Sequence, residues 1–254
     1  TLFHRHARGL TLTHEGERLF ETTHGFADRL ESTVHEINEG QTTPRGPLTV
    51  TTTISFGSIW LAHRLPRFFQ RYPQMRLHLL LSDEDLNLSS RQAEVGIRFH
   101  ESVQADLIQR RLLPIQHNLY ASKAYIARHG APEAIEDLRN HPVIAYGANV
   151  PLPIQDVNWV LHALDPKQPL EPLLTINNIY GVKQAVLAGI GVAALPEYMA
   201  RADLGLVHIL PELKGPRFQT YLVYPIELKG SLRVLALRDF LLEEIAAGDG
   251  GGPA

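Results

Sequence analysis

The chain of 254 residues is long enough to bury a sizeable core, either as one large domain or as two lobes of roughly 100–150 residues each. Its net charge of −3 argues against a protein that coats itself with positive charge to bind nucleic acid, although a local basic element is compatible with it. The absence of Cys excludes disulfides, thiolate catalysis and Cys-based zinc sites.

The chain lacks the features of a membrane or secreted protein. No stretch approaches the roughly 18 apolar residues of a membrane-spanning helix, and the first residues lack the apolar segment of a signal peptide. We therefore expect a soluble, cytoplasmic protein. The Gly-rich end GDGGGPA (248–254) is predicted to be a disordered tail.

The chain begins with a basic, turn-containing segment. The stretch HRHARG (4–9) precedes the first acidic residue, Glu15, and its Arg8-Gly9 step is typical of a tight turn. LTLT (10–13) alternates as a strand does. Thr13 then stands where the N-cap of a following helix is expected.

A long amphipathic helix is predicted over residues 14–40. Its narrow seam repeats at alternating spacings of four and three residues, through Leu19, Thr23, Phe26, Leu30, Thr33 and Ile37. Such a seam needs a partner, and we expect a second copy of the helix to supply it, with packing on the chain's own domain as the alternative. Two Pro and two Gly in EGQTTPRGP (39–47) then predict a domain boundary, with a hinge over residues 41–47.

Beyond this boundary, strand and helix patterns alternate. Strands are predicted at 48–53, 76–81, 95–99, 143–146, 173–177, 192–196, 206–210 and 221–225. Helices are predicted at 56–72 with a kink or restart at Pro66, at 85–92, at 123–129, at 180–188 and near 234–245. The alternation predicts a mostly parallel α/β sheet, and the number of units predicts two α/β lobes.

The sequence carries no recognised catalytic motif. There is no G-x-S-x-G, no H-E-x-x-H and no G-x-x-x-x-G-K-[ST]. Gly189-Ile-Gly191 follows a predicted helix and precedes a strand, so we interpret it as a helix C-cap and tight loop rather than a dinucleotide site. None of the 13 His forms a convincing metal-ligand set. We therefore expect no enzymatic activity, no metal and no cofactor.

Binding is the better supported chemistry. Two α/β lobes offer a cleft at the carboxyl ends of their strands, where helix N-termini favour anions. Thr53 and Ser55, beside Phe56, lie at such a strand-to-helix junction, where Ser55 is equally expected as a plain N-cap. Arg98 is a lone charge in an apolar strand; the commoner role is pairing with an acid such as Asp83 or Glu84, and the alternative is facing a ligand.

Two further candidates come from the second half of the chain. Asn177 and Asn178 end a predicted strand just before a helix and are interpreted either as ligand contacts or as a cap pair. Tyr146, at the end of VIAY, is a weaker candidate.

These stretches occur in the order and spacing of a known family. LFHRHARGLTLTHEGERLF (2–20) resembles the wing and linker-helix start of LysR-type transcriptional regulators. LTVTTTISFGSIWLAHRLPRFFQRYPQMRLHLLL (48–81) and LLTINNIYGVKQAVLAGIGVAALPEYMA (173–200) resemble parts of their effector-binding domain, as do AEVGIRF (93–99) and LYASKAYIARHGAPEAIEDLRNHPVIAY (119–146). The resemblance covers essentially residues 1–245, and it rests on order and spacing rather than on one specific motif.

The resemblance implies a fold and a domain organisation. We expect a wing of a winged helix-turn-helix at 1–13, a dimerising linker helix at 14–40, the hinge at 41–47 and an effector-binding domain at 48–247. This domain is expected to be a two-lobed, periplasmic-binding-protein-like (type 2) α/β fold, with lobe I at 48–118 and 224–247 and lobe II at 119–223. The crossing strands near 114–121 and 221–225 would form its hinge.

The resemblance also implies site residues. The effector contacts would be Thr53, Ser55, Phe56, Ser82, Arg98, Tyr146 and Asn177. The DNA contacts would be Arg5, His6 and Arg8, and the dimerisation contacts Leu19, Thr23, Phe26, Leu30 and Ile37. The base-reading recognition helix of the family is expected upstream of Thr1, so that the wing residues position the protein on DNA without specifying sequence.

We therefore predict a bacterial ligand-responsive transcriptional regulator. A small, anionic inducer would bind between the lobes and change how a homodimer or homotetramer of the full-length form binds promoter DNA. The alternative is a stand-alone small-molecule-binding protein, or a truncated dominant-negative partner without DNA binding.

Overall fold

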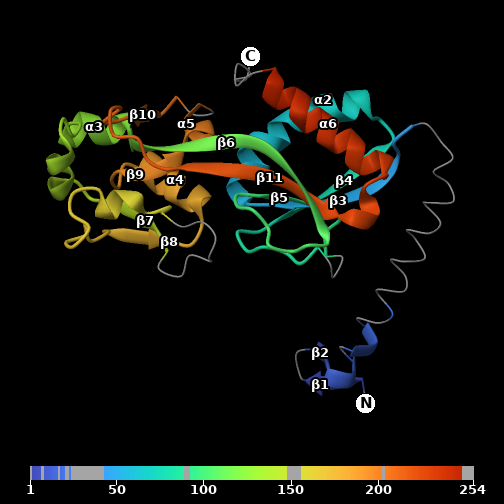
Figure 1. Ribbon diagram of the computed structural model, residues 1–254. Helices are drawn as coiled ribbons and strands as arrows, with labels where there is room; N and C mark the ends of the chain where they lie inside the picture. The colour runs from blue at the N-terminus through green and yellow to red at the C-terminus, as the bar shows by residue number, and fades with distance from the viewer. Residues whose placement is uncertain are drawn as a thin grey trace.

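The computed structural model describes residues 2–6, 9–16, 18–20, 23, 43–88, 92–147, 156–201 and 204–247. At the N-terminal end, β1 (Phe3–His6) and β2 (Gly9–Leu12) pair as an antiparallel hairpin (Figure 1). Residues 14–16, 18–20 and 23 are helical. The predicted N-cap is confirmed, because Thr13 Oγ1 accepts a hydrogen bond from the Gly16 amide at 3.0 Å.

Most of the predicted strands and helices are present in the remaining part of the chain, together with the helix Glu197–Arg201 and the first half of the strand Leu107–Ser122, which were not predicted. The strands are β3 (Gly46–Thr52), β4 (Met75–Leu81), β5 (Val95–Arg98), β6 (Leu107–Ser122), β7 (Ile144–Tyr146), β8 (Leu174–Ile176), β9 (Ala193–Pro196), β10 (Leu206–His208) and β11 (Arg217–Pro225). The α-helices are α2 (Leu65–Arg71), α3 (Lys123–His129), α4 (Ile179–Leu187), α5 (Glu197–Arg201) and α6 (Leu232–Ala246). A π-helix η1 (Phe56–Leu61) and short 3-10 helices η2 (Ala62–Arg64), η3 (Ile135–Asn140), η4 (Trp159–His162) and η5 (Ile226–Leu228) complete the described elements.

The helix predicted at 56–72 is a continuous helical segment that consists of three helix types, π, 3-10 and α. It runs as η1, η2 and α2 in succession. Pro66 falls in the first turn of α2, where its missing N–H deprives the helix of no hydrogen bond. The predicted restart at Pro66 is therefore confirmed.

The prediction of a helix at 85–92 was wrong for residues 85–88, which are the described part of this range. Residues 85–88 form an irregular segment. The physical reason is that Arg98 donates from its Nη2 to the Leu86 carbonyl at 2.9 Å and lies near the Asp85 carboxylate. A buried guanidinium therefore takes a carbonyl that a helix would use for its own ladder.

The main sheet is mixed rather than mostly parallel, which corrects the sequence prediction. Its strand order is β10-β6-β11-β5-β3-β4, with β9 also paired to β6. β3 is parallel to β4 and to β5, but β11 is antiparallel to both β5 and β6. The difference arises because β6 and β11 are not linked to the sheet by helical crossovers; they run between two groups of elements in opposite directions.

Those two groups are the lobes of the fold (Figure 1). We call β3, β4, β5, η1, α2 and α6 the first lobe, and α3, β7, β8, α4, β9, α5 and β10 the second lobe. Along β6, residues up to Gln116 pair with β11, whereas His117–Tyr120 face β9 and the last three residues face β10. β6 therefore begins in one lobe and ends in the other.

Each lobe has apolar packing of its own. In the first lobe, α2 meets α6 through Phe68 and Phe240, whose ring centroids are 5.2 Å apart. In the second lobe, the fully or almost fully buried Leu119, Tyr125 and Val192 belong to one cluster. Among the described residues, every helix is too short or too polar to cross a lipid bilayer.

The two strands that cross between the lobes, β6 and β11, contain a β-bulge, where one side-chain hydroxyl makes hydrogen bonds to the backbone. The register of β11 against β6 shifts between Gln219 and Tyr221. Thr220, which is fully buried, accepts a hydrogen bond from the Leu113 amide at 3.1 Å and donates one to the Leu113 carbonyl at 2.6 Å. The side chain thus replaces ladder hydrogen bonds that the bulge removes.

Thr220→Val keeps the shape of this side chain but removes both hydrogen bonds. We expect the free energy of unfolding to fall by about 1–3 kcal/mol, because the amide and the carbonyl of Leu113 lose a buried partner. Urea unfolding measures the change. Thr175→Val, at an exposed position of β8, is the control and should change stability by less than about 0.5 kcal/mol. Equal effects of the two substitutions would contradict this account of the bulge.

Candidate functional site

A cavity lies where the two lobes and the crossing strands meet. The first lobe contributes Thr53, Ser55, Asp83 and Phe99; the second contributes Tyr146, Val157, Ile179, Pro196 and Tyr198; the crossing strands contribute His117 and Phe218. Its volume is about 30 Å³, and about 10–15 Å³ on this measure suffices for one water. The cavity therefore holds about two waters as it stands, and a larger ligand requires the lobes or the lining side chains to part.

A hydrogen bond between two buried hydroxyls joins the lobes at the cavity. Ser55 Oγ and the Tyr198 hydroxyl are 2.8 Å apart. Ser55 is free to make this contact because Thr53 caps the helix start instead, its Oγ1 accepting from the Phe56 amide at 3.4 Å. Burial raises the pKa of Tyr198, so its hydroxyl stays protonated and available as a donor.

Asp83 supplies a carboxylate to the same cavity. It follows β4, and its Oδ1 accepts a hydrogen bond from the Ile54 amide at 3.1 Å. Its Oδ2 is buried and has no hydrogen-bond partner among the described residues. Burial raises the pKa of Asp83. Burial, and then the nearby charge of Asp83, raise the pKa of Tyr146 to about 12, which indicates that the two side chains are close.

His117 lies on the strand that crosses between the lobes. Its side chain is 3% exposed and meets Phe218 edge-to-face, with ring centroids 4.6 Å apart. Burial lowers the pKa of His117 to about 3, so the ring is neutral at physiological pH. Its Nδ1 is buried and has no hydrogen-bond partner in the described part of the chain.

Comparison with known proteins identifies the family. The LysR substrate binding domain model matches residues 41–246. The chain belongs to the LysR family. The two-lobed mixed α/β architecture described above is therefore that of a LysR regulatory domain, as the sequence predicts.

Relatives of this LysR-family chain are transcriptional regulators. An HTH-type transcriptional regulator from Xanthomonas campestris pv. campestris is 29% identical over 249 residues, which are 96% of this chain and 72% of the relative. The regulator CrgA from Neisseria meningitidis serogroup C is 27% identical over 249 residues, covering 96% of this chain and 82% of CrgA.

Solved structures agree with this assignment. A structure of CrgA from Neisseria meningitidis matches with a TM-score of 0.71 at 26% identity, covering 96% of this chain and 84% of that chain. The full-length Vibrio cholerae virulence activator AphB matches with a TM-score of 0.67 at 22% identity, covering 96% and 83%. At that identity, the likeness to AphB concerns the fold alone.

The structure brings together some of the effector-binding residues predicted for this LysR-family chain. Thr53, Ser55 and Tyr146 line the cavity. Phe56 is fully buried behind its wall, 5.6 Å from Phe99 and 5.7 Å from Tyr198 between ring centroids. Whether these residues contact an effector stays a prediction.

Two other predicted residues lie outside the lining. Ser82 Oγ accepts a hydrogen bond from the Glu84 amide at 3.0 Å. Asn177 is exposed, and its neighbour Asn178 caps α4 by accepting from the Gly181 amide at 2.7 Å. The cap interpretation of this pair therefore holds for Asn178.

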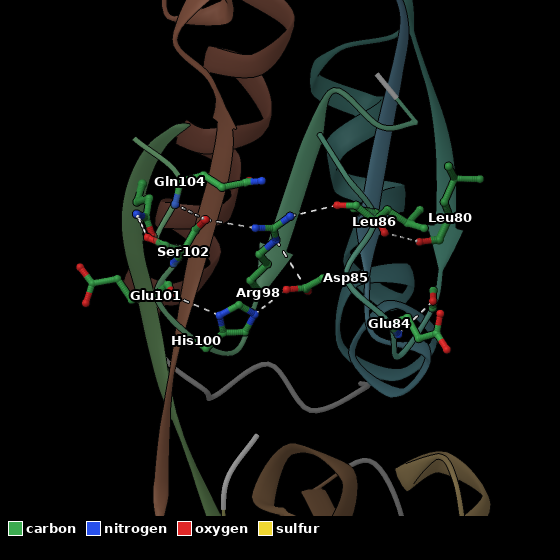
Figure 2. A network of polar contacts seen from close by, with 12 residues as sticks. Leu80, Glu84, Asp85, Leu86, Arg98, His100, Glu101, Ser102 and Gln104 are labelled. Carbon is green, nitrogen blue, oxygen red and sulfur yellow. Dashed lines mark hydrogen bonds and ion pairs between the residues drawn. The ribbon is translucent and has the colours of Figure 1, made fainter. Parts of the chain in front are cut away.

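Arg98 is engaged within the first lobe rather than at the cavity (Figure 2). Besides its contact with the Leu86 carbonyl, its Nη1 lies 3.3 Å from Ser102 Oγ and its Nε lies 3.7 Å from Asp85 Oδ1. The side chain is 7% exposed. The commoner role for such an arginine, pairing with an acid at the strand end, describes its position, although the acid is Asp85 and not Asp83 or Glu84.

His100, two residues after Arg98, belongs to the same network (Figure 2). Its Nε2 lies 2.6 Å from Asp85 Oδ2 and its Nδ1 lies 3.1 Å from the Glu101 carbonyl. Both partners are acceptors, so the ring is held as an imidazolium. Burial lowers the pKa of His100, but these hydrogen bonds and the Asp85 charge outweigh it and raise the pKa overall.

Sequence reasoning missed five lining residues that define the character of the site, namely Asp83, Phe99, His117, Tyr198 and Phe218. One signal was available for the acid. β3 and β4 are parallel neighbours, so their carboxyl ends lie at one edge of the sheet, and Asp83 follows β4 as Thr53 follows β3. The register that brings β6, β11 and α5 to the same place is not visible in a local pattern.

The predicted DNA-binding and dimerisation residues are only partly within the described ranges. Arg5 and His6 lie on β1, whereas Arg8 is outside the described residues. Leu19 is 47% exposed, and Thr23 Oγ1 donates back to the Leu19 carbonyl at 2.8 Å. The other predicted dimerisation residues, Phe26, Leu30 and Ile37, lie outside the described residues.

His117 should make the stability of the fold sensitive to acid. The unfolded chain binds a proton on this ring near pH 6.5, whereas the folded ring, whose pKa is about 3, does not. Stability therefore falls as pH decreases from 6.5 toward 3, by up to about 1.4 kcal/mol per pH unit. His117→Gln should flatten this acid limb in urea unfolding measured at several pH values.

His100→Gln is the matched control, because the sign is opposite. The pKa of His100 is raised in the folded state, so its contribution is present below pH 6.5 and lost as pH rises through the folded pKa. This substitution should change the limb above pH 6.5 and leave the decline between pH 6.5 and about 4 in place; below about pH 4 it also affects Asp85, whose pKa His100 lowers. An unchanged acid limb in His117→Gln would contradict the buried neutral state of this ring.

Proposed function

We propose that this LysR-family chain belongs to a bacterial transcriptional regulator that is controlled by a small molecule bound between its two lobes. The observation that carries the proposal is the cavity itself, whose lining is drawn from the first lobe, the second lobe and both crossing strands. A ligand held there contacts every part of the domain that lobe movement would displace. Binding can then shift an open–closed equilibrium by its differential affinity for the two states.

The proposed lobe division follows the sequence prediction. Residues 48–118 and 224–247 form one lobe and 119–223 the other, with β6 and β11 as the hinge. Residues 114–116 of β6, where its partner strand begins to change, and Thr220 at the bulge lie within or beside the predicted crossing segments. We infer that the bulge is the point about which the lobes turn.

The cavity supports binding rather than catalysis. It contains a serine and a histidine, the side-chain types of a nucleophile and its base. However, Ser55 Oγ is hydrogen-bonded to Tyr198 at 2.8 Å, so the base that would activate it is replaced by a hydroxyl of very low basicity. Among the described residues, no group of three or more His, Asp or Glu side chains could hold a metal ion.

The interlobe hydrogen bond should hold the cavity closed. Tyr198→Phe removes one hydroxyl without changing the ring, and should shift the lobes toward the open state by about 2- to 10-fold, equivalent to about 0.5–1.5 kcal/mol. Because the chain contains no Cys, two can be introduced at the exposed Glu136 and Glu227, one on each lobe, for single-molecule energy transfer between dyes.

Tyr72→Phe is the control for this measurement, since it removes a tyrosyl hydroxyl from the end of α2, outside the cavity. It should leave the distribution of distances unchanged. If Tyr198→Phe also leaves it unchanged, the hydroxyl pair does not set the position of the lobes.

We further propose that the full-length form binds promoter DNA as a dimer or tetramer assembled through the linker helix. Arg5, His6 and Arg8 would contact phosphates or the minor groove, and Leu19, Thr23, Phe26, Leu30 and Ile37 would form the helix pair. One described side chain of the seam supports this proposal, because Leu19 is 47% exposed.

Leu30→Glu in the full-length form should dissociate the helix pair and weaken binding to the promoter beside its own gene. Sedimentation velocity measures the assembly, and fluorescence anisotropy measures DNA affinity at fixed salt. Glu31→Gln, one residue along the helix and off the seam, should change neither. If the wild-type full-length form bound this promoter no better than unrelated DNA, the proposed function would be wrong. If Leu30→Glu kept the same assembly, the seam would be misplaced.

A further inference from the structure

Two side chains that line the cavity each have a buried polar atom without a hydrogen-bond partner among the described residues. Asp83 Oδ2 is a carboxylate oxygen and accepts only. The other is Nδ1 of the His117 ring, which is neutral and therefore has one accepting nitrogen.

Three amides at the helix starts near the cavity are already hydrogen-bonded to the protein's own side-chain oxygens. The sequence predicts that the amides at the helix start after β3 bind a ligand carboxylate. In the structure, the Ile54 amide donates to Asp83 Oδ1 at 3.1 Å and the Phe56 amide donates to Thr53 Oγ1. At the other helix near the cavity, the Gly181 amide donates to Asn178. The Asp83 carboxylate thus stands where the ligand carboxylate was predicted.

The charge of the lining points the same way. Among the described residues that line the cavity, Asp83 is the one acid, His117 is neutral and there is no Lys or Arg. Arg98, which the family resemblance implies as an effector contact, is buried in its own contacts with Asp85, Leu86 and Ser102 (Figure 2). A carboxylate ligand would meet a like charge without a partner for its own.

Aromatic side chains form much of the remaining wall. Phe99, Tyr146, Tyr198 and Phe218 come from both lobes and from a crossing strand. The faces of such rings attract cations, most strongly where water is excluded. A carboxylate surrounded by aromatic rings therefore suits a cation with an apolar body.

We propose that the effector of this cleft is a small organic amine, bound as its ammonium ion by Asp83. The inference rests on the proposed function only in taking the cleft as the effector site. The ammonium donates to Asp83 Oδ2, further polar groups on the ligand match the neutral His117 ring and the tyrosyl hydroxyls, and the apolar body packs against the rings, Val157 and Ile179.

The test compares probes of one shape and different charge. Benzylamine, benzyl alcohol and benzoate are titrated into the wild-type chain by isothermal titration calorimetry at neutral pH. We expect benzylamine to bind at least about tenfold more tightly than benzoate, as expected of a charged hydrogen bond. This comparison needs no variant, so it does not depend on the folding of any substitution.

Two variants then locate the binding. Asp83→Asn keeps an oxygen for the Ile54 amide but loses the charge, and should weaken benzylamine binding by about tenfold or more. Asp85→Asn removes a carboxylate two residues away that belongs to the Arg98 network and not to the cavity, and should leave benzylamine binding unchanged. Thermal unfolding of both variants verifies that they are folded.

Each other outcome overturns the inference. Tighter binding of benzoate than of benzylamine, or equal loss in both variants, would assign the cleft to another ligand class or place the amine elsewhere, and would leave the proposed regulator intact. Absence of binding by all three probes would also reject the amine class represented here. Failure of the proposed function would be seen separately, as absence of promoter binding by the full-length form.

Discussion

The pairing of β6 with β11 is the constraint on which the rest of the domain depends. Both strands run from one lobe into the other, so every relative position of the lobes has to be accommodated by this two-stranded connection. The strands remain hydrogen-bonded across the bulge because Thr220 supplies the two contacts that the ladder lacks at Leu113. A bulge increases local twist and bends its strand, so its position sets where the connection can bend. The cavity forms near this point, with Phe218 two residues before Thr220 on β11 and His117 four residues after Leu113 on β6.

The chemistry of the cavity follows from an arrangement at the edge of the first lobe's sheet. Parallel β3 and β4 end side by side, and the chain after β3 turns at once into a helix whose first amides lack partners within the helix. Asp83, following β4, accepts from the Ile54 amide with one oxygen, and its other oxygen is buried without a partner among the described residues. A carboxylate of the protein itself thus meets the helix start, where an anion is favoured. The same local motif, with a neutral residue after β4, would favour ligands of the opposite sign.

Much of the architecture can be predicted from the sequence, because local sequence patterns determine the positions of many strands and helix caps. Alternating apolar residues place β3, β4 and β11 to within a few residues, and the capping positions of Thr13 and Gly189 are as the pattern predicts. The prediction failed where a distant side chain decides the local structure. Residues 85–88 have the composition of a helix, yet contact with Arg98 from β5 holds them in an irregular segment. Likewise, the direction of β11 depends on its course between the lobes, which strand periodicity does not encode.

The candidate site was less predictable for the same reason. Thr53 and Ser55 could be found because a strand-to-helix junction is a local feature. Tyr198 could not, since it reaches Ser55 across 143 positions of the chain. Arg98 is conspicuous in an apolar strand, whereas Asp83 is one of several acids in Ser-Asp-Glu-Asp, and only the fold places Asp83 at the cavity and Arg98 away from it. Asp83 lines the cavity, and Asp85 two residues later pairs with His100 at 2.6 Å outside it.

The two cavity-lining residues on the crossing strands, His117 and Phe218, limit how such a domain can be altered. His117 and Phe218 come from the two strands that connect the lobes, and their rings lie 4.6 Å apart between centroids. A substitution there changes the stiffness of the connection as well as the surface offered to a ligand, so recognition and response vary together at these two positions. The other lining residues do not combine these two roles, because residues such as Asp83, Tyr146 and Val157 each belong to one lobe only. To change the preferred compound while preserving the response to it, the lining residues that belong to a single lobe are the ones to randomise, with His117 and Phe218 left unchanged.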